Sequence, residues 1–270
     1  MMIVRGAVLL GLVAAVAVLL YFMVRLNLGV IWAIFKRDFL AYFGNPTGYL
    51  FLAVFVGLTQ GMSYNWNNMF FSRNIVDLQS MNVVLPWLLV GFVPTITMSS
   101  WSNERREGTD ALLFTMPVRD SEVILGKFAS CVGIYTIALT ICMFTQIAFL
   151  LYLGSPDVGL MCADFLGCWL LGVFFVGLGI VASTFSENVT LGFVGGAFLC
   201  LVFLVVGLLP SYFSLSNSYT GSILQAFSAN HHFDTMTKGM ITLEDLFCFV
   251  GGTGLLLYLN LLILSKRLWA

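Results

Sequence analysis

Hydrophobic residues in this chain come in long, uninterrupted runs, and the charged residues stand between those runs. A helix needs about 20 apolar residues to cross a bilayer. Stretches without any Asp, Glu, Lys or Arg cover 6–24, 39–72, 78–103, 128–156, 165–186, 188–233 and 246–265. Each of these stretches is long enough for one span. We therefore predict an all-α, polytopic membrane helix bundle with spans near 6–24, 48–66, 83–101, 122–152, 163–184, 189–210 and 246–265.

The composition of the chain agrees with this pattern. Of its 270 residues, 60% are hydrophobic and only 9% are charged, against about 25% charged residues in an ordinary soluble domain. This composition excludes a soluble enzyme and a disordered chain. A net charge of −1 predicts no nucleic-acid partner. The six cysteines form no CxxC pair, and no Cys/His cluster has zinc spacing, so we interpret the cysteines as packing residues and predict no metal site.

The basic residues divide unequally between the two sides of the predicted bundle. One side collects Arg5, Arg73 and Lys238. The other side collects Arg25, Lys36, Arg37, Arg105, Arg106, Arg119, Lys127, Lys266 and Arg267. Membrane proteins keep loops rich in Lys and Arg in the cytoplasm. We therefore expect a multi-pass protein of the cell membrane with its C-terminus in the cytoplasm and, if the first span is real, its N-terminus outside.

The first apolar run allows three interpretations. Arg5 followed by an apolar stretch resembles a signal peptide, but no small-residue cleavage site follows Tyr21. We therefore favour an uncleaved anchor, an extra N-terminal span within residues 1–28. The third possibility is that translation begins at Met23, in which case residues 1–22 are not part of the protein.

A short segment at 30–43 is aromatic on one side and charged on the other. At about 100° per residue, one sector of a helix would hold Ile31, Trp32, Phe35, Phe39, Tyr42 and Phe43. Arg37 lies on the opposite face, and Lys36 and Asp38 lie at the flanks. This pattern predicts an amphipathic helix in the membrane interface, ended by Asn45–Pro46. The alternative is an extension of the next span, which would bring these charges into hydrocarbon.

The densest charge in the chain opens another short segment, at 104–117. A run of charged residues comes first, and Gly108 then interrupts the helical pattern. Thr109 can cap a new helix that Pro117 ends and whose apolar face contains Leu112, Leu113 and Met116. A short cytoplasmic helix with an apolar face needs a surface that buries this face. We predict contact with the membrane or with a soluble partner; an ordinary charged loop is the alternative.

The last long loop, at 211–242, changes from polar to apolar along its length and precedes a predicted capping box, Thr242-x-x-Asp245. We interpret it as a re-entrant or interfacial cap on the outer side, with a mobile loop as the alternative. The chain has no P-loop, GxSxG or HExxH motif, so we predict neither a nucleotide site nor an enzyme. No charged residue lies at the middle of a predicted span, which argues against a secondary carrier.

Two glycine pairs and one proline predict details of helix packing. Gly57/Gly61 and Gly192/Gly196 have the small-residue spacing that lets helices approach closely. We favour contacts inside one subunit over a dedicated dimer motif. Pro94 lies inside the third predicted span, and we expect it to disturb the helix because it has no N–H to donate.

Three blocks of the sequence together resemble permeases of the type-2 ABC exporter family. They are FKRDFLAYFGNPTGYLFLAVF (35–55), LPWLLVGFVPTITMSSWSNERREGTDALLFTMPVRDSEVILGKF (85–128) and HHFDTMTKGMITLEDL (231–246). The middle block, with its W-x-x-E-R-R-x-G-T-x-x-L-L-x-T-x-P-V pattern, is the most specific. More narrowly, the chain is similar to permeases associated with gliding motility or nitrous-oxide-reductase maturation. The resemblance covers a six-span permease domain at 30–270, and the extra N-terminal span departs from it.

The resemblance implies a role for each short segment. Residues 30–43 would be a connecting helix with the interfacial residues Trp32, Phe35, Lys36, Arg37 and Phe39. Residues 104–117 would be the coupling helix that docks on a separate ABC ATPase subunit. Its predicted contact residues are Glu104, Arg105, Arg106, Glu107, Gly108, Thr109, Leu112, Leu113 and Met116. Residues 211–242 would match external re-entrant helices, and Ser186–Asn188 would be a second cytoplasmic contact.

The resemblance also implies a function. The chain would be the permease subunit of an ATP-driven exporter, a half-transporter that forms a dimer in the lipid bilayer with a second copy or a homologue. ATP would bind to the partner subunit, so no cofactor is expected in this chain. The apolar spans favour a lipid-linked, amphipathic or polymeric substrate over a small ion. Two other functions stay open: a membrane scaffold that anchors an ATPase-linked motility or maturation machine and, with less support, a secondary carrier or channel.

Overall fold

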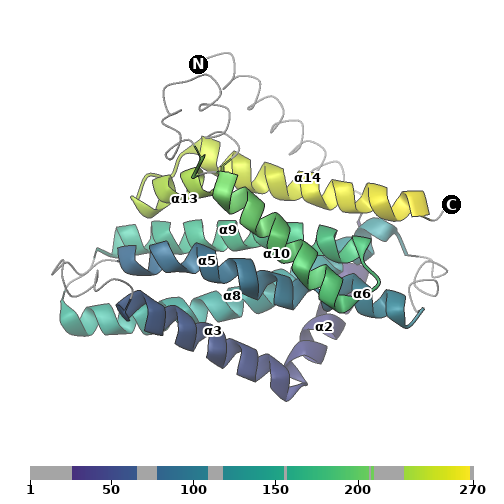
Figure 1. Cartoon of the computed structure of the whole chain (residues 1–270), viewed down its shortest axis with the longest axis horizontal. Coiled ribbons are helices and arrows are strands. Elements are labelled where there is room, and N and C mark those ends of the chain that lie inside the picture. Colours follow the sequence, from purple (N-terminus) through teal and green to yellow (C-terminus); the bar gives the residue numbers. More distant parts are fainter. Residues whose placement is uncertain are drawn as a thin grey trace, which may run out of the picture.

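The computed structural model describes residues 26–65, 78–108, 118–154, 157–206, 208–209 and 228–267, and this part of the chain is a bundle of helices (Figure 1). The helices are, in chain order, α2 (Leu28–Phe43), α3 (Pro46–Asn65), α5 (Gln79–Thr97), α6 (Ser99–Arg106), α8 (Asp120–Leu153), α9 (Val158–Phe185), α10 (Val189–Val206), α13 (Ala229–Thr237) and α14 (Leu243–Arg267). The described residues contain no strand. The predicted all-α architecture is therefore confirmed.

In the described part of the chain, five helical segments are long and apolar enough to cross a membrane: Gln79–Arg106, which comprises α5 and α6, Asp120–Leu153, Val158–Phe185, Val189–Val206 and Leu243–Ser265. Helices α2 and α3, bent by 78° at the break between them, supply a sixth when the pair is counted as one broken span. The spans predicted from 83–101 onward are thus found in their predicted order, and α3 lies at the position of the span predicted at 48–66. The predicted span at 6–24 lies outside the described residues.

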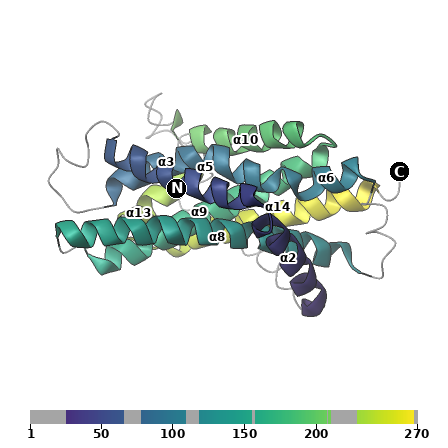
Figure 2. The same ribbon diagram turned by 90° about the horizontal axis from the view of Figure 1, so that it is seen from below.

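Helix α9 lies at the centre of the bundle, in contact with α5, α8, α10, α13 and α14 (Figures 1 and 2). It is apolar on every side, as expected for a helix that others surround. Glycines let two of these neighbours approach closely. A β-carbon on Gly172 would overlap the ring of Tyr135 from α8, and one on Gly179 would overlap Thr97 from α5. The Tyr135 hydroxyl also donates to the carbonyl oxygen of Cys168, at 2.7 Å. These contacts fix α5 and α8 against α9.

The two predicted glycine pairs differ in what they face. Gly192 and Gly196 of α10 lie against α6 and α5, and a β-carbon on Gly192 would meet the Ser102 hydroxyl at 3.1 Å. The predicted contact inside the subunit is confirmed for this pair. For Gly57 and Gly61 of α3 the prediction is wrong within the described part of the chain, because nothing lies within 4 Å of a β-carbon at either position. Both lie on an exposed side of α3.

The helices alternate in direction, so their ends gather at two opposite ends of the bundle (Figure 1). We call one the basic end, because it carries Arg105 and Arg106 at the end of α6, Arg119 before α8, and Lys266–Arg267 at the end of α14. The opposite one, the α13 end, carries α13 with Lys238 and the starts of α5, α9 and α14. The described basic residues thus sort between the ends as predicted, while the sidedness of the membrane stays a prediction.

The starts of two helices differ from the predicted positions. Helix α8 begins at Asp120, with Arg119 as its N-cap, rather than at the predicted position 122. Helix α9 begins at Val158, earlier than the predicted position 163, because Asp157 caps it by accepting from the N–H of Gly159 at 2.9 Å. The earlier start places Asp164 nearly two turns inside α9, where its side chain is fully buried.

Candidate functional site

The predicted ATPase-contacting residues begin in the last turn of α6. Glu107 is the C-cap of this helix, and Gly108 follows it with a φ of 66°. Glycine adopts this left-handed conformation at little cost, which explains why the helix ends here. The N–H of Gly108 donates to the carbonyl oxygen of Arg105 at 3.1 Å. The helix therefore ends where the sequence predicted an interruption. The remaining predicted contacts lie outside the described residues: Thr109, Leu112, Leu113 and Met116.

Glu104 points into the protein. Its Oε1 atom lies 2.7 Å from Nζ of Lys127 on α8 and 3.1 Å from Nη2 of Arg37 on α2. The Glu104 side chain is 16% exposed, that of Lys127 is 3% exposed and that of Arg37 is 54% exposed. One carboxylate thus joins α2, α6 and α8 at the basic end. We call Arg37, Glu104 and Lys127 the Glu104 cluster.

Lys127 is buried on a membrane-spanning helix, where an unpaired ammonium group is costly. Besides the ion pair with Glu104, its Nζ donates to the carbonyl oxygen of Ser100 at 2.6 Å. The same atom lies 4.8 Å from the centre of the Trp101 ring, a cation–π contact. From the sequence, Lys127 served only as a marker of sidedness. The sequence does contain a signal for this role, a lysine about two turns inside an apolar helix. A charge at that depth needs a partner within the protein.

A second buried carboxylate connects α2 with α8. The Glu122 side chain lies in the first turn of α8, and its residue is 4% exposed. Its Oε1 accepts from the backbone N–H of Asn27 at 3.0 Å, and its Oε2 accepts from that of Arg119 at 3.3 Å. Asn27 in turn caps α2 by accepting from the N–H of Gly29. The start of α2 is therefore held on the start of α8.

Helix α2 carries the predicted interfacial residues. Its aromatic rings form a ladder with centroids 4.9 to 5.2 Å apart along Trp32, Phe35, Phe39 and Phe43. The middle two rings lie against α8, where Gly133 leaves room for them. Trp32 is 64% exposed, and Lys36 is exposed as well. The predicted aromatic face exists and packs partly on α8, while its place in the membrane interface stays a prediction.

Hydroxyl groups fill the contact between α6, α9 and the turn after α9. The Ser183 hydroxyl donates to the carbonyl oxygen of Met98 at 3.1 Å and accepts from the N–H of Trp101 at 3.1 Å. The Ser102 hydroxyl lies 3.4 Å from that of Ser183 and 3.3 Å from that of Ser186. The helix that carries Glu104 is thus bonded to the Ser186–Asn188 turn, the predicted second cytoplasmic contact.

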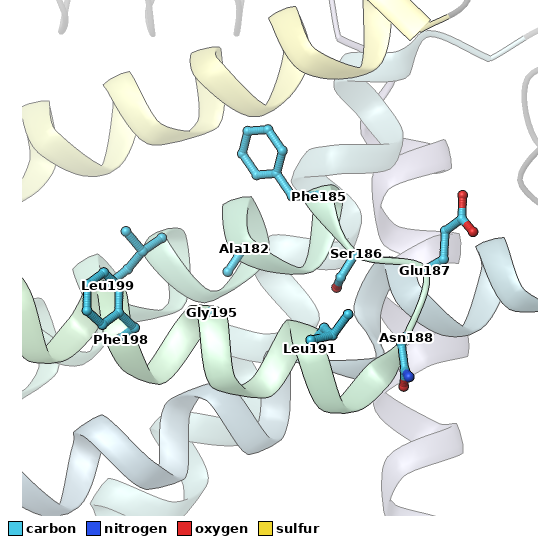
Figure 3. Close-up of a pocket in the computed structure, with 9 residues that line it drawn as sticks. All are labelled: Ala182, Phe185, Ser186, Glu187, Asn188, Leu191, Gly195, Phe198 and Leu199. Atoms are coloured by element: carbon cyan, nitrogen blue, oxygen red, sulfur yellow. The ribbon is translucent and has the colours of Figure 1, made fainter.

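A cavity of about 700 Å³ lies beside this turn (Figure 3). Its wall contains apolar side chains that are more than 60% exposed in the described chain, Phe185, Leu191 and Phe198. Glu187 and Asn188 project from the turn at its edge (Figure 3). An exposed apolar wall of this kind needs lipid or another protein to cover it.

The two adjacent histidines lie at the α13 end. Nδ1 of His232 lies 2.6 Å from Oδ1 of Asp245, and the Asp245 Oδ2 accepts from the hydroxyls of Thr235 and Thr242 at 2.9 and 2.7 Å. The N–H of Asp245 donates to the Thr242 hydroxyl at 3.3 Å, which confirms one of the two bonds of the predicted capping box. The Asp245 carboxylate accepts from the hydroxyl of Thr242 instead of from its backbone N–H. This network holds α13 on the start of α14. Among the described residues, no group of three or more His, Cys, Asp or Glu could hold a metal ion.

The fold and the basic end together define a multi-pass membrane protein with a tightly bonded, charged junction ahead of the segment that joins α6 to α8. The chain matches the family model described as ABC-2 family transporter protein over residues 68–263, and it belongs to this family. No curated protein matches its sequence.

Membership of this family makes the chain the permease component of an ABC transporter rather than a classical enzyme, and it implies an ATPase subunit as partner.

Proposed function

We propose that this chain is the membrane half of an ATP-driven exporter and that a separate ATPase subunit docks on its basic end. The observation that carries this proposal is the Glu104 cluster. The residue that opens the predicted coupling segment is bonded to both α2 and α8. A displacement of the segment after α6 would therefore reach three helices at once, which is what coupling to an outside motor requires.

Glu104 takes a different part in this proposal from the one that the sequence suggested. Its carboxylate is engaged by Lys127 and Arg37, so we assign it to transmission inside the chain. Arg106 and Glu107 are exposed at the end of α6, and we assign docking on the ATPase to them together with Arg105. Opposite charges at the rim of an interface orient the partner more than they add affinity.

Charge reversal tests docking at this end. Replacing Arg105 and Arg106 with Glu is expected to abolish co-purification of the ATPase subunit, while the chain still inserts into the membrane. The matched control is Lys238→Glu, which reverses an exposed charge at the α13 end and is expected to retain the ATPase. Normal co-purification of the double Glu variant would count against the proposal.

We further propose that two copies of this chain, or one copy and a homologue, form the substrate pathway. Exposed faces on α3 and α10 support this, because Gly57 and Gly61 face open space and Leu191 and Phe198 are each 63% exposed. Small residues with nothing against them suit the close approach of a second helix. Native mass spectrometry of the complex is expected to show two permease and two ATPase subunits. A complex with a single permease subunit would contradict this part of the proposal.

A membrane scaffold without transport is the second candidate, because the same basic end would anchor an ATPase-linked machine. Vanadate-sensitive movement of substrate in liposomes distinguishes an exporter from a scaffold. A secondary carrier has less support. Four charged residues are buried in the described spans, and each lies within about two turns of a helix end. They are Glu122, Lys127, Asp164 and Asp245. None lies at the middle of a described span, where ion-coupled carriers place such groups.

A further inference from the structure

A second cavity, of about 650 Å³, opens at the α13 end between α5, α10 and α13. Its volume lies in the range of small-molecule sites, about 300–1,000 Å³. The lining includes polar residues, Asn82 from α5 and Asn230, Asp234 and Lys238 from α13 and its C-cap. It also includes apolar residues, among them Val83, Trp87 and Leu204. The cavity therefore combines the polar and apolar groups that a site for an amphiphile needs.

Helix α13 turns one face to the bundle and the other to this cavity. Phe233 and Met236 are buried, and Met236 lies against α9, where a β-carbon on Gly167 would meet it at 3.1 Å. Asp234 and Lys238 are one helical turn apart on the opposite, exposed side. Because the packing of Met236 and the pairing of α13 with α14 hold this helix, its polar face is a fixed wall.

Asn82 is held in one orientation by a buried carboxylate. Its Nδ2 donates to Oδ1 and Oδ2 of Asp164 at 2.7 and 2.8 Å, and Asp164 is fully buried. Pro86 lies one turn further along α5, lines the same cavity and has no N–H, so it cannot donate to the backbone carbonyl of Asn82. The α5 wall thus presents an ordered amide beside a carbonyl that lacks its usual helical donor.

The rim of the cavity carries one charge of each sign. Partial burial raises the pKa of Asp234, while the charges of Lys238 and His231 act to lower it. A ligand head with a single charge would be opposed by one of the two rim residues. A head with an ammonium group and a phosphate would pair with both. Trp87, which is 51% exposed, offers an aromatic surface below the rim for the first part of an apolar tail.

We propose that this cavity binds a zwitterionic amphiphile. Its charged head lies between Asp234, Lys238 and Asn82, and its tail runs along Trp87 and Leu204. Binding needs only this chain. That the bound amphiphile is also the transported substrate rests on the proposed exporter function.

Quenching of tryptophan fluorescence tests the site in the purified chain without any ATPase. The probe is a lysophosphatidylethanolamine with a brominated tail, since bromine quenches a nearby indole. The difference between the wild type and Trp87→Phe isolates the signal from the cavity. We expect saturable quenching of Trp87 with an apparent Kd about ten-fold lower than for a maltoside or a lysophosphatidylglycerol with the same brominated tail.

Two single variants and one control separate recognition of the head from general apolar binding. Asp234→Asn and Lys238→Gln change exposed side chains, and each is expected to weaken binding of the zwitterionic probe about ten-fold without changing that of the maltoside. Asp157→Asn removes an exposed carboxylate at the same end and keeps an N-cap residue, so it is expected to bind like the wild type.

Equal affinity for the three head groups, or unchanged binding in both cavity variants, would overturn the inference. The proposed coupling to an ATPase is tested by co-purification at the basic end, and a failure there would leave this binding result standing. The two proposals therefore fail separately.

Discussion

Replacing Glu104 with Gln would keep the size of the side chain and remove the charge that compensates Lys127. The Lys127 side chain is 3% exposed and lies 2.7 Å from the Glu104 carboxylate. Removing one partner of a buried ion pair costs about 3–5 kcal/mol. Lys127 keeps its bond to the Ser100 carbonyl and its contact with the Trp101 ring, so we expect the lower end of that range, about 3 kcal/mol. At about 2–4 °C per kcal/mol for a chain of this size, the Tm of Glu104→Gln falls by about 6–12 °C.

Thermal unfolding of the purified chain in detergent, followed by intrinsic fluorescence, measures this loss in a double-mutant cycle. Lys127→Met is the second single variant. Replacing both partners of a buried ion pair with uncharged groups is often nearly neutral, so the double variant is expected to recover most of the loss. Arg37→Gln removes the more exposed partner and serves as the control, with a cost below about 1 kcal/mol. Additive losses in the cycle, or an unchanged Tm for Glu104→Gln, would refute the dependence of Lys127 on Glu104.

Two further predictions concern packing away from the Glu104 cluster. Gly179→Ala is expected to cost about 1–3 kcal/mol in thermal unfolding, because its β-carbon would overlap Thr97. Gly91→Ala, which meets open space, is expected to leave the Tm unchanged or to raise it slightly. Equal losses in the two variants would contradict the close packing of α9 on α5. His232→Ala removes a partner of the buried Asp245 and is expected to speed hydrogen exchange in α13 but not in α2. Unchanged protection of α13 would show that this pair does not hold the helix.

The number and order of the described spans could be predicted because length and apolar composition alone decide whether a segment can cross a bilayer. Local chemistry was also sufficient for the breaks at Asn45–Pro46 and Gly108, since proline and glycine act on the backbone where they stand. The start of α9 was misplaced because Asp164 was taken to mark the edge of a span. In the structure, Asn82 satisfies this carboxylate inside the bundle.

Contacts between distant segments could not be predicted. Gly57/Gly61 and Gly192/Gly196 have the same spacing, yet only the second pair meets a neighbouring helix within the described residues, because spacing does not say which face a partner occupies. For the same reason the sequence located Glu104 at the start of the predicted coupling helix but did not reveal that its side chain points into the protein. That direction depends on Lys127 and Arg37, which come from two other helices.

Photo-cross-linking in the assembled membrane complex shows at which end of the bundle the ATPase subunit acts. A photoreactive residue in place of Arg106, which is exposed at the basic end, is expected to cross-link to the ATPase subunit. The same residue in place of Val158, which is 67% exposed at the α13 end, is expected to give no such product. Cross-links from position 158 without any from position 106 would contradict docking on the basic end.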